Sequence, residues 1–358
     1  MKVMIAFYSG DRNPYLRLLI DSLKDAGLTV MIAEPRTVMP LLRAVARFGK
    51  PELVHLQWPI YFTSDRTYLH AIVHTIQFFV QILLLRLFGV RFVWTIHNIV
   101  NHQQYQLAWE RSACRILARV VDALIVHCDS AVALVAEAYG VTHAKLHVVP
   151  HGNYTTWYPK AISKSAARAD MGLPQDGRIY LYFGRIRRYK GIQRLVEAFH
   201  GVTTPEARLM LVGKTFSPET RNWLAEIQQD DPRIEAELSF VEDDLLVRYI
   251  CASDVIVLPY ENALTSGAAI LACSLGRPVI AAAVGCMQDL PRNASIFFSP
   301  GNTESLVSAL NQAGNADLSQ MGAAAYAYAS LFSWQKIAEL NLAIYHRVLK
   351  KNPMGAYE

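Results

Sequence analysis

The chain has 358 residues, of which 52% are hydrophobic and 18% charged, with a mean hydropathy of +0.17. This composition excludes a disordered chain, a collagen-like repeat and a small disulfide scaffold, and it supplies enough apolar residues for two or three domains. The net charge of +5 lies entirely in residues 1–150, which hold 15 Lys+Arg against 10 Asp+Glu, whereas the remaining residues hold 20 of each.

The first half alternates short apolar runs with longer amphipathic ones, which predicts a parallel sheet covered by helices on both faces. The predicted strands are Val3–Tyr8, Thr29–Ala33, Leu53–Gln57, Arg91–His97, Ala123–His127 and Leu146–Pro150. The predicted helices are Tyr15–Ala26, Tyr68–Phe88, Leu107–Val121 and Ala131–Tyr139. The basic excess of this half fits an anionic membrane surface or a phosphate-bearing substrate, and ordinary charge scatter explains it equally well.

One segment of this half, Ala71–Phe88, just reaches the length of a membrane span. His74, Gln77 and Gln81 interrupt it at helical spacing, so they form one polar stripe on a mostly apolar helix. Burial between the sheet and the surface is the favoured interpretation, and a position in the lipid interface or a true span are the alternatives.

The amino terminus and the cysteines indicate the compartment. The chain opens with Met1-Lys2 and enters a strand-like run at once, so no signal peptide is predicted. The five cysteines form no C-x-x-C pair, which argues against a disulfide-held protein and a cysteine-rich metal site. We therefore expect a reduced, cytoplasmic protein.

The second half repeats the alternation of strands and helices. The predicted strands are Ile179–Phe183, Arg208–Val212, Leu238–Val241, Val255–Leu258, Val279–Ala282 and Ser295–Phe298. The predicted helices are Ile192–Phe199, Pro218–Gln229, Asp243–Ala252, Ser266–Leu275, Thr303–Ala313 and a final Trp334–Leu349. The periodicity breaks between His151 and Gly177, so we expect Rossmann-like domains at 1–155 and 156–332, with residues 333–358 crossing back to the first domain.

Two segments of the second half point to phosphate binding at the carboxyl ends of strands. Thr265, Ser266 and Gly267 start a helix directly after a strand, and free N–H groups at such a start bind phosphate. The loop after Phe183 holds four cations within six residues, Arg185, Arg187, Arg188 and Lys190. Cations facing a helix start suit a diphosphate and stabilise it as it leaves. An ordinary capped helix and a solvated loop are the structural alternatives.

Polar residues also follow the predicted strands of the first half. His97 and Asn98 follow one strand, where an imidazole can contact a sugar or move a proton. Gln57 and Trp58 follow another and suit stacking against a sugar ring. Asp11, after the first strand, is a candidate general base. Each of these residues fits a purely structural position equally well.

Several common sites are absent from the sequence. It has no G-x-x-x-x-G-K-[ST] P-loop, no G-x-G-x-x-G dinucleotide fingerprint and no H-E-x-x-H zinc spacing, although His102, His127 and His151 also follow or end strands. We therefore expect no metal and no cofactor, because protein cations can neutralise a diphosphate.

In combination, four motifs make the chain resemble the GT-B-fold glycosyltransferases of family 4, also called glycosyl transferases group 1. They are Gly184-Arg185…Lys190-Gly191, Val149-Pro150-His151-Gly152-Asn153, Pro259…Gly276-x-Pro278-Val279-Ile280-Ala281 and Phe332-Ser333-Trp334…Tyr345. The resemblance implies two Rossmann-like domains facing across a cleft, with a nucleotide-sugar donor held mainly by the second and the acceptor by the first.

The resemblance also assigns roles to individual residues. It implies that Arg185 and Lys190 bind the diphosphate together with the helix start at Thr265, Ser266 and Gly267. Base contacts are expected near Val241 and Glu242, and His97 is expected to approach the donor sugar. The acceptor-binding candidates are Asn13, Gln57, Trp58 and Asn98.

One departure from the family pattern concerns the glutamates that grip the sugar. The family's E-x7-E pair would fall at positions 263 and 271, where this chain has Ala263 and Leu271, and Glu261 is a partial substitute. With His97-Asn98 and Ser266-Gly267 together, the sequence resembles a bacterial branch that builds exopolysaccharide or O-antigen units on a polyprenyl diphosphate. We expect a hexosyltransferase that uses GDP-mannose, a lipid-linked saccharide acceptor and peripheral contact with the inner membrane face, and no nucleic acid. The alternatives are a nucleotide-sugar 2-epimerase and a non-catalytic nucleotide-sugar-binding protein.

Overall fold

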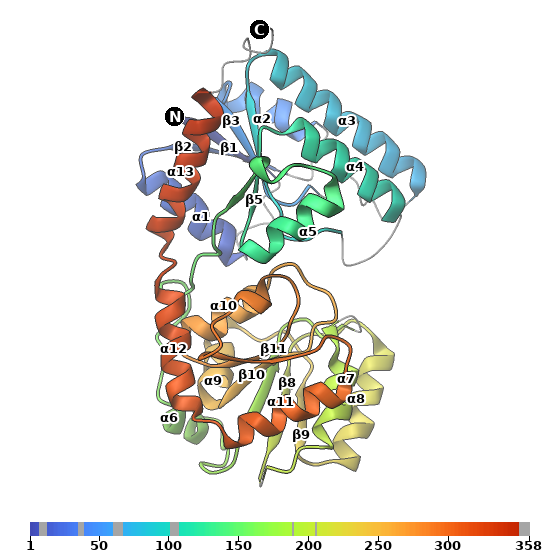
Figure 1. Ribbon diagram of the computed structural model, residues 1–358, viewed down its shortest axis with the longest axis vertical. Helices are drawn as coiled ribbons and strands as arrows, with labels where there is room; N and C mark the ends of the chain where they lie inside the picture. The colour runs from blue at the N-terminus through green and yellow to red at the C-terminus, as the bar shows by residue number, and fades with distance from the viewer. Residues whose placement is uncertain are drawn as a thin grey trace. The chain divides into compact units, whose positions relative to one another are not determined.

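A computed structural model describes residues 1–6, 13–34, 39–59, 67–100, 107–187, 190–204 and 206–350. The chain forms two compact units (Figure 1). Unit 1 contains residues 1–151 and the segment from Trp334 onward, and unit 2 contains Gly152–Ser333.

Unit 1 is built on a six-stranded, all-parallel sheet in the order β2-β1-β3-β4-β5-β6. Its strands are β1 (Lys2–Ala6), β2 (Thr29–Ala33), β3 (Leu53–Leu56), β4 (Arg91–Thr95), β5 (Ala123–Val126) and β6 (Leu146–Val148). Its helices are α1 (Pro14–Asp25), α2 (Pro40–Phe48), α3 (Tyr68–Leu87), α4 (Leu107–Val120), α5 (Asp129–Tyr139), the short η2 (His143–Lys145) and α13 (Trp334–Lys350).

Unit 2 has a second six-stranded parallel sheet, in the order β12-β11-β10-β7-β8-β9. Its strands are β7 (Ile179–Phe183), β8 (Arg208–Val212), β9 (Ile234–Glu237), β10 (Val255–Leu258), β11 (Val279–Ala282) and β12 (Ser295–Phe298). Its helices are α6 (Lys164–Asp170), α7 (Ile192–Phe199), α8 (Pro218–Asp230), α9 (Asp243–Ala252), α10 (Gly267–Ser274), η4 (Gly285–Asp289), α11 (Thr303–Asn315) and α12 (Leu318–Ser330).

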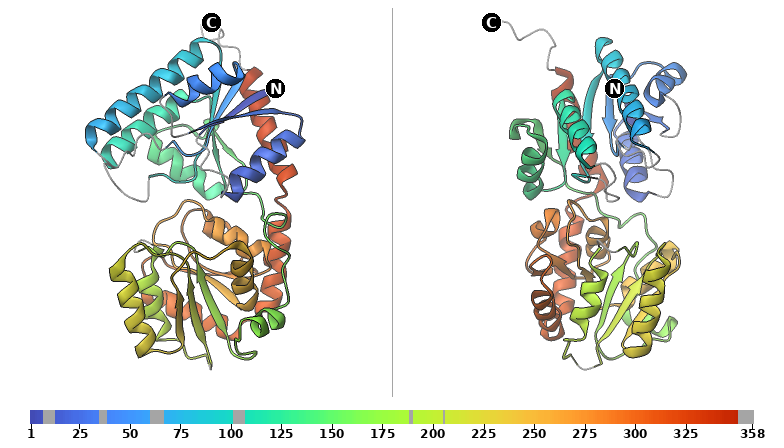
Figure 2. Two further views of the ribbon diagram at one scale, coloured as in Figure 1. Left: turned by 180° about the vertical axis from the view of Figure 1, so that it is seen from behind. Right: turned by 90° about the vertical axis from the view of Figure 1, so that its right-hand side faces the viewer.

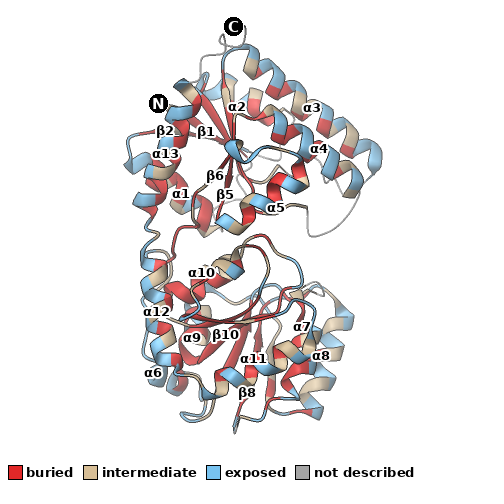
Figure 3. Ribbon diagram, in the orientation of Figure 1, coloured by how far each residue is buried: buried red, intermediate tan, exposed pale blue. Residues whose placement is uncertain are grey.

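Most strands of both sheets are runs of apolar residues, which explains why helices cover both faces of each sheet. Strands such as β5 and β10 are buried at every position, as expected where helices cover both faces of a parallel sheet. The side view in Figure 2 shows helices on either face of each sheet, and Figure 3 shows the buried strands at the centre of each unit. The predicted fold class, with two Rossmann-like parallel sheets, is confirmed.

The strand predicted at Leu238–Val241 is wrong, because the chain pairs as β9 at Ile234–Glu237 instead. β9 lies at the edge of its sheet, where only one neighbour is needed and charged residues are tolerated, so its sequence IEAE lacks the expected apolar run. Phe240, which made the later segment look like a strand, is exposed in the following loop. Helices α2, α6 and α12 were not predicted.

Helix α3 has two polar side chains buried against the protein. Gln81 is buried and its side-chain oxygen accepts the backbone N–H of Leu41 at the start of α2. Thr75 is buried as well and accepts a hydrogen bond from the indole N–H of Trp109 on α4. Among the described residues, α3 is the one helix long and apolar enough to cross a membrane, and a third of its most apolar stretch is buried. Burial, the interpretation that the sequence favoured, therefore holds for one face of the helix only.

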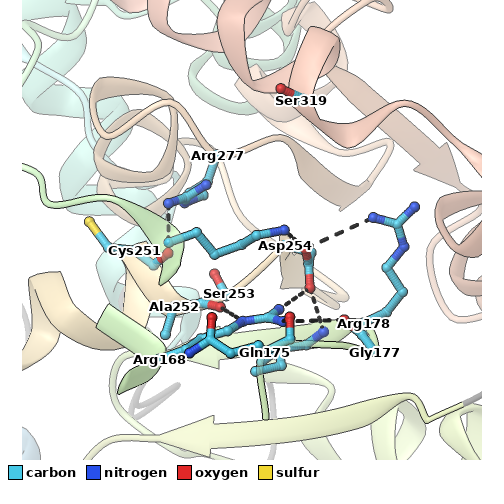
Figure 4. Close-up of polar contacts among 12 residues, drawn as sticks. Arg168, Gln175, Gly177, Arg178, Cys251, Ala252, Ser253, Asp254, Arg277 and Ser319 are labelled. Carbon is cyan, nitrogen blue, oxygen red and sulfur yellow. Dashed lines mark hydrogen bonds and ion pairs between the residues drawn. The ribbon is translucent and has the colours of Figure 1, made fainter. Parts of the chain in front are cut away.

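A buried ion cluster fixes the amino-terminal edge of the unit 2 sheet (Figure 4). The Arg168 guanidinium is 1% exposed and donates to an Asp254 carboxylate oxygen at 2.6 Å and to the Ala252 carbonyl at 2.9 Å. The same Asp254 oxygen accepts the backbone N–H of Ile179, the first residue of β7, and Lys164 pairs with the other oxygen. The cluster ties α6 to the starts of β7 and β10, and a buried charge of this kind requires such pairing.

Candidate functional site

The order of strands in unit 2 directs attention to one edge of the sheet. β7 lies between β8 and β10, so the chain crosses first to one side of β7 and later to the other. In open α/β sheets, ligands bind at the carboxyl ends of the two strands that flank such a reversal. Those two strands are β7 and β10, and the loops that follow them contain the predicted diphosphate-binding residues.

The two loops lie against each other because a glycine permits close approach. Gly191 has φ +72°, and a Cβ built on it would lie 1.9 Å from the Pro259 carbonyl oxygen. Gly213, after β8, has φ +145°, and its Cβ would lie 1.9 Å from the Gly184 carbonyl oxygen. Any side chain at either position would force the backbones apart. The loops after β7, β8 and β10 are therefore packed backbone to backbone.

Tyr260 joins the basic loop to the helix start. The Lys190 ammonium lies 3.7 Å from the centre of the Tyr260 ring, a cation–π contact. The Ser266 side chain lies close enough to the hydroxyl of the same tyrosine to affect its pKa, which burial raises to about 12. Lys190 and Ser266, predicted separately from two loops, are thus brought together around one buried ring.

Ser266 is the N-cap of α10. Its hydroxyl oxygen accepts the backbone N–H of Ala269 at 3.2 Å, in the geometry that N-cap serines favour. Thr265 and Gly267 beside it are half-buried. The first turn contains no acidic residue, so the positive end of the helix is not neutralised locally. This arrangement can receive a phosphate group.

The other predicted residues of unit 2 differ in their surroundings. Arg185 is exposed two residues after the end of β7. Glu261 is also exposed, and its carboxylate pairs with Arg194 at 2.9 Å. Val241 is half-buried, and the exposed Glu242 is the N-cap residue of α9, without a side-chain capping bond.

In unit 1, a chain of buried hydrogen bonds runs across the carboxyl half of the sheet. The amide of Gln57 bridges two imidazoles: its oxygen lies 2.9 Å from Nε2 of His97, and its nitrogen lies 3.2 Å from Nε2 of His55. His55 Nδ1 contacts the Tyr345 hydroxyl of α13 at 2.6 Å. His97 Nδ1 lies 3.2 Å from Nε2 of His127. Both ring nitrogens of His97 therefore face groups inside unit 1.

Burial keeps these imidazoles neutral. It lowers the pKa of His55 to about 3 and that of His127 to about 4, and it lowers the pKa of His97 well below its ordinary value. Neighbouring imidazoles add to the effect for His55 and His97, since two adjacent cations repel each other. A neutral imidazole can orient a hydroxyl by hydrogen bonding.

Aromatic rings enclose His97. The Trp58 indole stacks on it with ring centres 3.9 Å apart, and Tyr15 of α1 meets its edge at 5.0 Å. A small pocket of about 80 Å³ opens beside this pair, lined by His97, Trp58, Asn98 and the buried carboxyl side chain of Glu110, among others. One face of Trp58 is thus covered by protein, and the sugar stacking predicted for it needs the other face.

Asn13 and Asp11 are the remaining predicted residues of unit 1. Asn13 is half-buried at the N-cap of α1, where its carbonyl accepts the backbone N–H of Arg17. Asp11 lies outside the described residues, as do Arg188 and His102. No group of three or more His, Cys, Asp or Glu side chains that could hold a metal is present in the described part of the chain.

Sequence reasoning missed several residues around Lys190 in unit 2 and around His97 in unit 1. Tyr260 had a usable signal, because it follows Pro259 directly at the end of a predicted strand. His55 had none, since it lies inside an apolar strand, and Tyr345 lies 290 residues away from its hydrogen-bond partner. Tyr15 and Glu110 lie in the first turns of helices, where nothing distinguishes them from surface residues.

Comparisons with known proteins agree with this architecture. Residues 15–155 match the family described as Glycosyltransferase Family 4, and residues 177–315 match Glycosyl transferases group 1. The chain is 30% identical over 273 residues to the GDP-mannose:glycolipid 4-beta-D-mannosyltransferase of Xanthomonas campestris pv. campestris, covering 76% of this chain and 70% of that one. The chain belongs to the family 4 (group 1) glycosyltransferases.

Solved structures support the fold of this glycosyltransferase. Sucrose-phosphate synthase of Thermosynechococcus elongatus superposes with a TM-score of 0.77 at 21% identity, covering 98% of this chain and 100% of that one. HepE of Anabaena, solved in complex with UDP, gives a TM-score of 0.72 at 17% identity, covering 97% and 100%. At these identities the likeness establishes the fold alone.

The family's paired glutamates have no counterpart in the structure of this glycosyltransferase. Leu271 is buried within α10 and packs in the core, while Ala263 is half-buried in the preceding loop. Glu261, the partial substitute expected from the sequence, is engaged by Arg194.

Proposed function

We propose that this glycosyltransferase moves mannose from GDP-mannose to a hydroxyl of a glycolipid. The observation that carries the proposal is the 30% identity, over 273 residues, to a GDP-mannose:glycolipid mannosyltransferase, which extends over both units. The polar and cationic groups at the β7 and β10 loops support it, because a nucleoside diphosphate is the leaving group of that reaction.

Charge stabilisation is the role we assign to the groups in the loops after β7 and β10. As the bond between the sugar's anomeric carbon and the diphosphate oxygen breaks, negative charge accumulates on the diphosphate. Arg185 and Lys190 would neutralise that charge, and the N–H groups at the start of α10 would donate hydrogen bonds to the phosphate oxygens. The contacts of Val241 and Glu242 with the base are part of the same proposal.

We further propose that the reaction inverts the anomeric configuration. GDP-mannose carries its mannose in the α form, and the name of the Xanthomonas relative specifies a β product. A single displacement gives this result: the acceptor oxygen bonds to the anomeric carbon from the face opposite the diphosphate, and a base takes the hydroxyl proton. This chain has Ala263 and Leu271 in place of the glutamates expected in the family. This fits an enzyme that binds its donor sugar without that glutamate pair.

The acceptor hydroxyl is assigned to unit 1. Asp11 is the proposed base. His97 is proposed to position the sugar through contact with its ring, because Gln57 and His127 occupy its two nitrogens. Asn13 and Asn98 are the remaining proposed acceptor contacts. If the acceptor is a polyprenyl-linked saccharide of a bacterial surface polysaccharide, the enzyme works in the cytoplasm as a peripheral protein of the inner membrane face.

The deciding experiment incubates the purified protein with radiolabelled GDP-mannose and a lipid-linked saccharide extract in detergent. We expect label in the lipid fraction, and the one-bond carbon–proton coupling at the anomeric carbon, measured by NMR, should report a β linkage. A reaction without acceptor is the control: a new nucleotide sugar there would identify an epimerase, and donor binding without product from any acceptor would identify a binding protein.

Metal dependence is tested in the same assay. We expect transfer to continue with excess EDTA, because Arg185 and Lys190 supply the positive charge that a divalent metal supplies in other enzymes. Loss of transfer in EDTA, restored by Mg²⁺ or Mn²⁺, would contradict this part of the proposal.

A further inference from the structure

The outer face of α3 carries a continuous apolar row. Six residues spaced alternately four and three positions apart, the spacing of one helix face, are between 39% and 74% exposed. They are Leu69, Val73, Ile76, Val80, Leu83 and Leu87. We call this set the α3 row. At 1.5 Å per residue, α3 is about 30 Å long, so the row is far longer than the single exposed apolar residues that soluble proteins commonly show.

Helix α3 is apolar on its outer face as well as on most of its buried face, unlike a surface helix of a soluble domain. Its polar side chains Thr75 and Gln81 are buried and hydrogen-bonded to α4 and α2, while the apolar row faces outward. A surface helix in water has a polar outer face and directs its apolar stripe toward the core. The sequence of α3 is therefore matched to an apolar environment on its outer face.

An open groove continues the α3 row toward α4. It has a volume of about 780 Å³ and is lined mainly by apolar side chains of both helices, including Phe79, Val80, Leu83 and Ile116. Figure 1 and Figure 2 both show α3 and α4 side by side along their length, and Figure 3 shows exposed positions on both. The groove and the α3 row together form one apolar surface two helices wide.

The charges around this surface are positive. α3 contains no acidic residue, and Glu110, the one acid of α4, is buried. α4 presents three exposed arginines at intervals of four residues, Arg111, Arg115 and Arg119. Lys50 lies at the carboxyl end of α3, where its ammonium contacts the Phe88 carbonyl at 3.0 Å.

We propose that the α3 row and the α3–α4 groove dock on a bilayer that contains anionic phospholipids, with the acyl chains filling the groove. An apolar helix face with cations beside it suits the boundary between acyl chains and anionic headgroups. A second copy of this chain suits the surface less well, because it would bring the same arginines and no exposed acid from α3 or α4 to pair with them. The proposal rests on the proposed function only for its purpose, which is to bring unit 1 to a glycolipid in the membrane.

The test is co-sedimentation of the full-length protein with vesicles of phosphatidylcholine alone or with about 30% phosphatidylglycerol, neither containing glycolipid. The wild type should bind the anionic vesicles more tightly, and added salt should weaken this binding. The Leu83→Glu, Leu87→Glu double variant should bind at least about tenfold more weakly. Leu331→Glu is the matched control, because Leu331 is an equally exposed leucine of unit 2, and it should bind like the wild type.

Three outcomes would overturn the proposal. They are wild-type protein that binds neither vesicle, a double variant that binds like the wild type, and a wild-type dimer in lipid-free solution that the double variant converts to a monomer. Since all three leucines are exposed, we expect unchanged melting temperatures. Mannosyl transfer to a detergent-solubilised acceptor is measured on the same variants: if transfer persists while vesicle binding is absent from the wild type, the docking proposal fails and the proposed function stands.

Discussion

Two arginines of unit 2 lie at opposite ends of the same sheet and have opposite surroundings. Arg168 is buried at the amino-terminal edge, where Asp254 and backbone carbonyls occupy its guanidinium (Figure 4). Arg185 is exposed at the carboxyl edge, two residues beyond β7. The first is fully used by the fold, and the second has its charge directed to solvent. A cation at the amino-terminal edge of the sheet thus has a structural role, and a cation at the carboxyl edge is a candidate for ligand binding.

The reason lies in the topology. At the amino-terminal edge, the starts of β7 and β10 need their N–H groups satisfied, and Asp254 accepts one of them from Ile179. At the carboxyl edge, the loops after the same strands flank the reversal of strand order, where open α/β sheets bind their ligands. Substitutions at the two edges should therefore differ in effect, with a loss of stability at the amino-terminal edge and a loss of transfer at the carboxyl edge.

Arg168→Ala should destabilise unit 2 by about 3–5 kcal/mol, because it leaves the buried Asp254 carboxylate without its main partner. Urea unfolding followed by circular dichroism measures the change. Arg248→Ala is the matched control: it breaks an ion pair with Asp170 in which both side chains are about half exposed, and should cost less than about 1 kcal/mol. Equal effects of the two variants would contradict the structural role of Arg168.

Replacing Arg185 and Lys190 together by Ala should reduce kcat/KM for mannosyl transfer by about 10²–10³-fold. The melting temperature should change little, because the Arg185 side chain is exposed and Lys190 is only half-buried. Arg292→Ala, which removes an exposed arginine just before β12, controls for the loss of charge. Wild-type transfer by the double variant would refute the role of both cations.

The buried histidines of unit 1 predict a loss of stability in acid. Their folded-state pKa values, about 3 for His55 and about 4 for His127, lie below the unfolded value near 6.5. Their contribution to the free energy of unfolding is therefore complete above about pH 6.5. It is lost as the pH falls toward 4, at about 1.4 kcal/mol per pH unit for each histidine. Hydrogen exchange at pH 7 and pH 5 should show β3 and β5 losing protection more than β7 and β10. Equal losses in the two sheets would contradict the assignment.

Ser266→Ala should cost about 1 kcal/mol of stability by removing the N-cap of α10. It should also reduce transfer severalfold, because the same hydroxyl lies beside Tyr260, whose ring contacts Lys190. Ser217→Ala removes an equivalent cap from α8, where the side chain accepts the Thr220 N–H at 3.1 Å. The control should lose similar stability and keep its activity. If both variants lose transfer equally, Ser266 has only a structural role.

Much of the fold could be predicted from the sequence, because the strands of a parallel sheet are short apolar runs between helices. The edge strand β9 was missed because burial on one side only does not demand an apolar sequence. The candidate residues around Lys190 and Ser266 were found because they follow strands, which is a local property. Tyr345 with His55 could not be found, because that contact joins the last helix to the third strand and leaves no local signal.

The orientation of α3 was also beyond the sequence. Its periodicity defined a polar and an apolar face but could not say which one meets the protein. Hydrogen bonds that Gln81 and Thr75 accept from neighbouring helices decide this, and they depend on tertiary contacts.

The most direct test of the central claim is calorimetric titration of GDP into the wild type, the Arg185→Ala, Lys190→Ala double variant and Arg292→Ala. If the carboxyl edge of unit 2 grips a diphosphate, the double variant should bind GDP at least about tenfold more weakly, and Arg292→Ala should match the wild type. Equal affinity in all three proteins would contradict the claim.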